Sequence, residues 1–246
     1  MGCNKPNFPL HEILFSSFGS KVQLQMIIAY PTYKDLKSVS DDEIKEFLIK
    51  NRYRRTKDIE KVLNRIKNYH QIISEDVEYA YKFESRCICN ILLTIKTELK
   101  EIETEMESIT ENHSLGKYFQ SLPGAGKILS AKLLALFGDN QNRFHSANDA
   151  QCLFGTAPKN YQSGQYHKVI MRKACNKTAR AILYKYAFAS LQFSSWAREY
   201  YDKQKNKGKN HSVAVRALSN KWLKIIYSIW KNEVIYDETK KTSLVA

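Results

Sequence analysis

The stretch that decides the fold is Ser121-Leu122-Pro123-Gly124-Ala125-Gly126-Lys127-Ile128-Leu129-Ser130-Ala131-Lys132-Leu133-Leu134. Its Pro-Gly-Ala-Gly segment predicts a sharp turn, because glycine adopts positive φ angles at little cost. Apolar residues at helical spacing follow from Ile128 onward, so a helix is expected to begin near Lys127. The sequence therefore predicts two helices joined by a very tight turn at this point.

The turn resembles the helix-hairpin-helix element of DNA-binding proteins. In such a turn the first backbone N–H groups of the second helix face outward and, with the helix dipole, hold a phosphate. Gly124 and Gly126 would shape the backbone, and Lys127 would add positive charge. We expect Gly126→Val to clash with the turn and abolish DNA binding. The alternative interpretation is a plain corner between two helices that binds nothing.

Upstream of the turn the sequence predicts a helical arm, since residues 56–110 contain neither glycine nor proline. Apolar residues spaced alternately by four and three positions form a coiled-coil seam. The seam residues are Ile88, Leu92, Ile95, Leu99, Ile102, Met106 and Ile109. Two interpretations stay open: an intramolecular hairpin, in which a helix over about 56–80 packs back on this one, or a stalk that dimerises.

Helical signals occupy most of the remaining chain. A short helix within residues 8–30 is expected to end at Tyr30, before Pro31, and Ser40 with Glu43 forms a capping box. Helical periodicity marks segments near 127–137, 146–154, 174–194, 197–205 and 211–231, while 158–171 is predicted to be a loop or short hairpin. The predicted fold is mainly α: a helical arm (1–112), a compact α-helical domain (113–237) and a flexible tail (238–246).

The charge of the chain is concentrated in its second half. The 246 residues carry a net charge of +14, yet residues 1–112 hold 17 Lys and Arg against 18 Asp and Glu. Residues 113–246 hold 22 against 7. A one-sided positive excess indicates a polyanionic partner, and we favour nucleic acid over anionic lipid. No apolar run approaches the ~18 residues of a membrane span, and five irregularly spaced cysteines favour a reducing cytoplasm.

Ser163 is the candidate nucleophile, because it precedes Gly164 in a segment where basic residues follow and acids are missing. Cations near a serine hydroxyl would stabilise the charge that develops when it attacks a phosphodiester. The candidate nucleic-acid-binding cations are Lys168, Arg172, Lys173, Lys177 and Arg180. A Ser-Gly pair is by itself usually only a turn. His167 is interpreted as a solvated loop residue rather than a catalytic base.

The order of short motifs resembles the insertion-sequence-110 family of transposases (the 116/110/902 group) over about residues 118–237. The matching pieces are Leu122–Gly126, Ala131–Leu134, Gly138-Asp139, Arg143-Phe144, Ser146-Ala147, Phe154–Pro158, Gln162–Gly164, Ala174–Lys177 with Arg180, Ala187, Tyr200-Tyr201, Lys207–Lys209 and Ala214–Trp230. The stretch from Pro9 to about Ser108 is similar to the middle region of the family.

The resemblance implies DNA transposition and strand exchange through a catalytic serine that forms a covalent link to DNA. By its position in the motif, Ser163 is that serine. The resemblance also implies assembly through the coiled coil into a homo-oligomer, a structured guide RNA, and a location in the cytoplasm with the nucleoid. The expected partners are double-stranded DNA and that guide RNA, with no membrane.

Family members also carry an N-terminal nuclease-like domain whose acidic residues hold Mg²⁺, and this chain departs from that pattern. The acids within residues 1–55 are mostly helix-cap acids outside any predicted buried strand, so no two-metal site is expected. We therefore expect no metal and no cofactor in this chain. The predicted function is that of a truncated transposase or recombinase. The alternatives are a non-catalytic DNA- or RNA-binding remnant or regulator and a plain coiled-coil scaffold.

Overall fold

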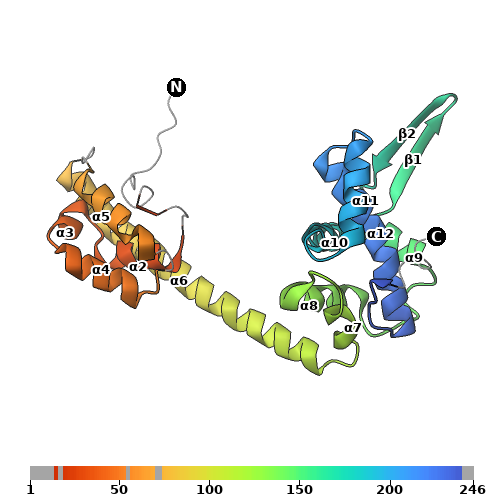
Figure 1. Ribbon diagram of the computed structural model, residues 1–246, viewed down its shortest axis with the longest axis horizontal. Coiled ribbons are helices and arrows are strands. Elements are labelled where there is room, and N and C mark those ends of the chain that lie inside the picture. The colour runs from red at the N-terminus through yellow and green to blue at the C-terminus, as the bar shows by residue number, and fades with distance from the viewer. Residues whose placement is uncertain (1–13, 16–18, 54–55, 70–73, 240–246) are drawn as a thin grey trace. The chain divides into compact units, whose positions relative to one another are not determined.

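The computed structural model describes residues 14–15, 19–53, 56–69 and 74–239 (Figure 1). The chain divides into two compact units, residues 1–101 and 102–246. The described residues are mainly helical and include one two-stranded antiparallel sheet. No helix formed by these residues is long and apolar enough to cross a bilayer.

The described residues of the first unit form four short helices and a 3-10 turn ahead of a long helix. They are α2 (Lys21–Ala29), α3 (Tyr33–Lys37), α4 (Asp41–Lys50), η1 (Thr56–Asp58) and α5 (Ile59–Lys67). The predicted end at Tyr30 is confirmed, since its N–H donates to the Met26 carbonyl as the C-cap of α2. The predicted Ser40–Glu43 capping box is also present at the start of α4. Residues 1–13 lie outside the described residues.

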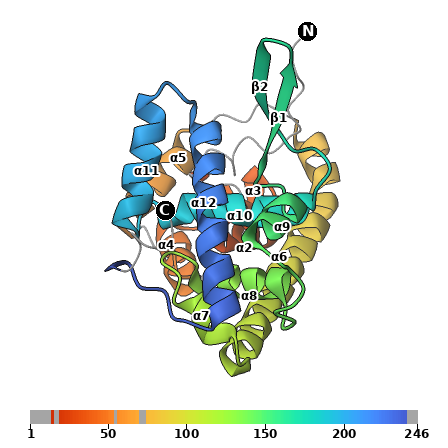
Figure 2. The same ribbon diagram turned by 90° about the vertical axis from the view of Figure 1, so that its right-hand side faces the viewer.

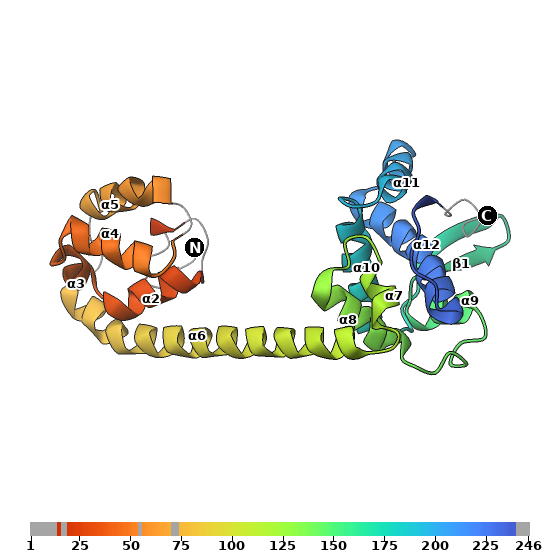
Figure 3. The same cartoon turned by 60° about the horizontal axis from the view of Figure 1, so that its bottom comes forward.

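Apolar side chains from these helices form the core of the first unit, as the buried Leu36, Leu48 and Leu63 show. Figure 3 shows α4 lying beside α5 and α2 beside the long helix. Leu24 and Ile27 of α2 cover Cys89 of the long helix and its neighbours. This packing buries one side of the early part of the long helix.

The long helix is α6 (Glu75–Asn112), 38 residues in length. The prediction of a single helix over 56–80 is wrong, because α5 ends at Lys67 and α6 begins at Glu75. Asn68 forms the C-cap of α5, and its N–H donates to the Asn64 carbonyl at 3.0 Å. The seam residues of α6 are exposed: Ile88, Ile95, Leu99, Ile102 and Ile109 each keep about half of their surface accessible.

After α6, the described part of the second unit forms six helices and a hairpin. They are α7 (Gly116–Gln120), α8 (Gly126–Phe137), α9 (Ala147–Leu153), β1 (Pro158–Ser163), β2 (Tyr166–Met171), α10 (Lys177–Ser190), α11 (Ser195–Asn206) and α12 (His211–Asn232). Each predicted helix of this half is confirmed to within a few residues. The segment 158–171, which was predicted to be a loop or short hairpin, forms a hairpin. Most of these starts are explained by capping side chains, such as Ser146 for α9 and Asn210 for α12.

Helix α12 is the central element of the second unit, and Figure 2 shows it crossing in front of α10 with α11 beside it. Its apolar stripe at Leu218, Trp222, Ile226 and Ile229 is buried, as expected from its spacing. Trp222 donates its indole N–H to the Ser190 hydroxyl at 2.7 Å. Both tryptophans of α12 are therefore core residues rather than ligand contacts.

The segment after α12 folds back onto the unit as far as the described residues reach. The Tyr236 N–H donates to the Ser121 hydroxyl at 3.0 Å, and the Ser194 hydroxyl donates to Glu238 at 2.9 Å. Burial opposes ionisation of Glu238, but hydrogen bonds from Tyr236, Ser194 and Ser195 outweigh it and lower its pKa. Together, these hydrogen bonds join the chain beyond α12 to the start of α11 and to the turn after α7.

Candidate functional site

The turn between α7 and α8 has the shape that its glycines predict. Gly124 has φ +76° and Gly126 has φ +55°, both in the region that favours glycine. A Cβ at Gly124 would lie 2.8 Å from a ring carbon of Phe193 and 3.1 Å from the Ala189 carbonyl oxygen. A Cβ at Gly126 would meet nothing within 4 Å, so the clash expected for Gly126→Val is wrong. Only the backbone conformation requires glycine there.

The start of α8 carries one of the predicted basic residues. The Lys127 ammonium is paired with the Glu107 carboxylate of α6, although its side chain remains 69% exposed. The Ser130 hydroxyl donates to the Gly126 carbonyl. Lys127 is therefore accessible at the turn, but part of its charge is already offset by Glu107.

The β1–β2 hairpin places Ser163 at its far end. Ser163 is the last residue of β1 and pairs with Tyr166, across a two-residue loop that contains Gly164 at φ +56°. Every residue of β1 is exposed. The Tyr161 and Tyr166 rings lie 6.4 Å apart, edge to face, close to the serine. The candidate nucleophile therefore lies on an exposed tip flanked by two tyrosine rings.

The predicted cations Arg172, Lys173, Lys177 and Arg180 lie at the opposite end of the hairpin. Met171 ends β2 opposite Pro158, the first residue of β1. Ser163 is five strand residues from Pro158, a separation of roughly 16 Å at about 3.3 Å per residue. The structure thus brings these cations together with one another rather than with Ser163. The side chains of His167 and Lys168 lie outside the described part of the chain.

The junction that follows β2 is held by specific hydrogen bonds. The Arg180 guanidinium donates to the Arg172 carbonyl at 2.9 Å. Asn176 caps α10 by accepting from the Ala179 N–H at 2.9 Å, and its own N–H donates to the Leu153 carbonyl at 2.8 Å. Arg180 therefore holds the junction between β2 and α10 in place, in addition to carrying a positive charge.

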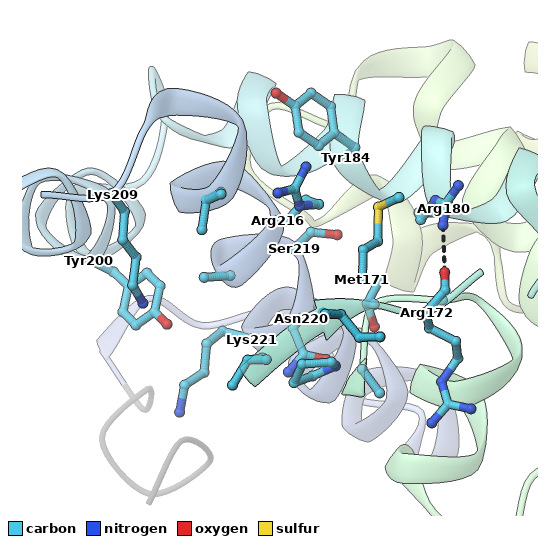
Figure 4. A pocket seen from close by; sticks show the side chains of 18 residues that line it. Met171, Arg172, Arg180, Tyr184, Tyr200, Lys209, Arg216, Ser219, Asn220 and Lys221 are labelled. Atoms are coloured by element: carbon cyan, nitrogen blue, oxygen red, sulfur yellow. Dashed lines mark hydrogen bonds between the residues drawn. The ribbon is translucent and has the colours of Figure 1, made fainter. Parts of the chain in front are cut away.

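A cavity of about 300 Å³ lies at the base of the hairpin, and Figure 4 shows the side chains around it. Strand ends, the loop before β1, and helices α10, α11 and α12 all contribute to its wall. The residues that line it are Gly155, Thr156, Ala157, Pro158, Val169, Ile170, Met171, Arg172, Arg180, Tyr184, Tyr200, Lys209, Val213, Arg216, Ala217, Ser219, Asn220 and Lys221. Five of these residues are Lys or Arg, and no Asp or Glu is among them.

Sequence reasoning found only Arg172 and Arg180 among the cavity cations and missed Lys209, Arg216 and Lys221. A signal existed on α12, where cavity residues recur at helical spacing on the face beside the buried stripe. These residues are Val213, Arg216, Ala217, Asn220 and Lys221. No pattern in the sequence indicates that this face of α12 lies beside Arg172.

The cavity wall is supported from behind by α9. The Gln151 side-chain amide donates to the Asn220 backbone carbonyl at 2.9 Å, and the Thr156 N–H donates to the Gln151 carbonyl at 3.0 Å. Gly155 has φ +70°, and a Cβ there would lie 2.7 Å from the Cβ of Cys175. The glycine at this position therefore allows the loop before β1 to lie against the start of α10.

No group of three or more His, Cys, Asp or Glu that could hold a metal ion occurs among residues 14–15, 19–53, 56–69 and 74–239.

Comparison with known proteins connects this unit to a family. Residues 116–202 match the sequence model described as "Transposase IS116/IS110/IS902 family". The chain is 24% identical over 233 residues to an uncharacterized 42 kDa protein of insertion element IS900 from Mycobacterium paratuberculosis, covering 94% of this chain and 58% of that protein. It is 29% identical over 140 residues to the mini-circle putative transposase for IS117 from Streptomyces coelicolor, covering 57% and 34%.

An uncharacterized 43.6 kDa protein of insertion element IS110 from Streptomyces coelicolor is 24% identical over 151 residues, covering 61% of this chain and 37% of that protein. The chain thus spans between about a third and three fifths of the length of these relatives. The matched segment runs from α7 to α11 and includes the turn, the hairpin and most of the cavity wall. Residues 116–202 of this protein are therefore similar to the transposase domain of the IS116/IS110/IS902 family.

Proposed function

We propose that this protein is a DNA recombinase of an insertion element, with Ser163 as the nucleophile. The observation that carries the proposal is the exposed position of Ser163 at the hairpin tip, inside the segment that matches the transposase family. An exposed tip on a two-stranded hairpin has room to reach a phosphodiester in a duplex. Strand exchange by a serine requires such access.

The proposed reaction is the transfer of a DNA phosphoryl group to a serine, with a covalent intermediate like that of acyl transfer to an enzyme serine. The Ser163 hydroxyl loses its proton as its oxygen bonds to a DNA phosphorus atom, and one sugar oxygen leaves with a proton. The phosphoserine link keeps the bond energy for rejoining to a second strand. Because Arg172 and Arg180 lie about a hairpin length from Ser163, other groups would have to stabilise the charge that develops on phosphorus.

Duplex DNA would be held by two features of the second unit. The backbone N–H groups of the first turn of α8, from Gly126 onward, would bind a phosphate, as in a helix-hairpin-helix element. The exposed Lys173 and Lys177, with Lys127 and Arg172, would neutralise further phosphates. Contacts of this type position DNA without selecting its sequence.

Assembly would use the exposed seam of α6. About half of the surface of Leu99 and Ile102 is accessible, and apolar side chains repeated at this spacing are stabilised by a second helix. We propose that α6 pairs with α6 of a second copy. We further propose that the protein acts together with a structured guide RNA and that it acts in the cytoplasm, at the nucleoid.

A covalent adduct tests the nucleophile. The protein is incubated with labelled element-end DNA, target DNA, Mg²⁺ and candidate guide RNA, and the products are separated on a denaturing gel. We expect a labelled protein–DNA band with the wild type and with Ser212→Ala, a matched serine variant on α12. Ser163→Ala should give no band. Absence of the band from the wild type, where a full-length relative forms one, would overturn the enzymatic proposal.

The second candidate function is a non-catalytic nucleic-acid-binding protein that regulates a complete transposase. The separation of Ser163 from the cations at the hairpin base favours it, because those cations then serve binding rather than chemistry. Two assays separate the two functions: a regulator retains duplex DNA at low salt in a native gel-shift assay but forms no adduct on the denaturing gel under any condition.

A further inference from the structure

We infer that the cavity at the base of the hairpin binds one unpaired nucleotide, with the base inside and its phosphate at the cationic rim. This inference rests on the proposed nucleic-acid-binding function and names a site that the function does not require. It follows from three properties of the cavity: unpartnered polar atoms in its wall, its size and aromatic lining, and the sign of its charge.

Polar groups in the cavity wall lack partners. Among the described residues, six buried side-chain N and O atoms have no hydrogen-bond partner, and four of them belong to residues that line this cavity. They are Thr156 Oγ1, Arg172 Nε, Ser219 Oγ and Asn220 Oδ1. Ser219 is only 3% exposed. A buried polar atom without a partner costs about 1–3 kcal/mol, so these side chains would gain hydrogen bonds by turning toward a polar ligand in the cavity.

The wall chemistry fits a nucleobase. The phenol rings of Tyr184 and Tyr200 and the apolar side chains of Met171, Val213 and Ala217 surround a volume of about 300 Å³. That volume is at the lower end of the range for small-molecule sites, which suits a single nucleotide. Extruded bases are held by aromatic and apolar side chains, with hydrogen bonds to their edges. Figure 4 shows Tyr184, Met171 and the Ser219 hydroxyl around the same hollow.

The rim chemistry fits a phosphate. Five Lys and Arg line the cavity with no carboxylate among the lining residues. Arg216 and Lys221 from α12 face the space from one element, while Arg172 and Lys209 come from two others. A neutral apolar ligand would leave these charges uncompensated, and a bare phosphate would leave the tyrosine and methionine wall empty. A nucleotide satisfies both.

The test compares three short duplexes at about 150 mM salt: fully paired, with one unpaired adenine nucleotide, and with an abasic residue at the same unpaired position. We expect wild-type protein to bind the unpaired base about tenfold more tightly than its abasic counterpart, the effect of stacking one base. Ala217→Phe, which fills the cavity, should remove this preference and leave affinity for the paired duplex unchanged. Ala181→Phe, at an exposed position of α10, is the matched control.

A second variant guards against misfolding of the first. Arg216→Gln removes the positive charge and keeps a polar side chain that adds no bulk, and it should reduce the preference for the unpaired nucleotide several-fold at an unchanged unfolding temperature. An RNA duplex with one unpaired nucleotide forms a parallel arm, and a larger preference there would assign the nucleotide to RNA. Equal binding of the base-bearing and abasic DNA and RNA duplexes would overturn the inference alone. Failure to bind any duplex at low salt would overturn the proposed function as well.

Discussion

At the residue scale, two glycines two positions apart in the same turn are required for different reasons. Gly126 has a positive φ and open space, so a side chain there suffers only from its backbone conformation. Gly124 has a positive φ and is also packed against Phe193 and the Ala189 carbonyl at the end of α10. The sequence motif treats the two as equivalent, whereas their surroundings differ.

Gly126→Ala should lower the free energy of unfolding by about 1–2 kcal/mol, the cost of placing a residue with a Cβ in the left-handed region. For a protein of this size, each kcal/mol corresponds to roughly 2–4 °C in the unfolding temperature. Gly124→Ala should cost more, because the Ala189 carbonyl is backbone and cannot move aside cheaply. Thermal unfolding of both variants measures this, and equal midpoints would contradict the packing argument.

At the element scale, α6 is a long helix whose apolar residues are packed in its earlier part and exposed in its later part. Cys89, Leu92 and Leu93 pack against α2, while Leu99 and Ile102 remain exposed. A helix with an unpaired apolar seam is stabilised by association. The intramolecular hairpin interpretation leaves the seam without the helix that it requires, since α5 is already used in the core of the first unit.

Leu99→Lys should therefore weaken self-association by placing a charge in the seam between two copies of α6. Sedimentation equilibrium over a range of protein concentrations measures the change. We expect the wild type to be a dimer or higher oligomer and Leu99→Lys to shift toward monomer by at least tenfold in dissociation constant. Glu101→Lys, which changes the charge more but lies outside the seam, should associate like the wild type. A monomeric wild type would exclude the α6 pairing.

At the scale of the whole molecule, the positive excess is confined to the half of the chain that contains the hairpin, the cavity and the turn. If about 6–10 phosphates are neutralised, the affinity for duplex DNA should fall ~10³–10⁵-fold between about 50 and 200 mM salt, because bound counterions are released on association. Fluorescence anisotropy across that range measures the slope. A flat response would show that the cations are not used against phosphates.

The sequence by itself determined most of the described helices and turns of this protein, although not the break between α5 and α6. The turn at Pro123–Gly126, the capping box at Ser40, the apolar stripe of α12 and the position of the hairpin were all predictable. Each depends on residues within a few positions of one another, where backbone geometry and capping decide the outcome. The uneven charge and the family resemblance were equally present in the linear order.

Only the tertiary structure decided how the candidate site is divided. Ser163 and Arg172 are nine residues apart in sequence, yet an extended hairpin holds them at its opposite ends. Arg172 and Arg216 are far apart in sequence, yet they line one cavity. The apolar faces of α10, α11 and α12 must be buried together, and this burial carries the polar residues beside those faces into a shared space. No periodicity along the chain encodes which of those neighbouring faces meet.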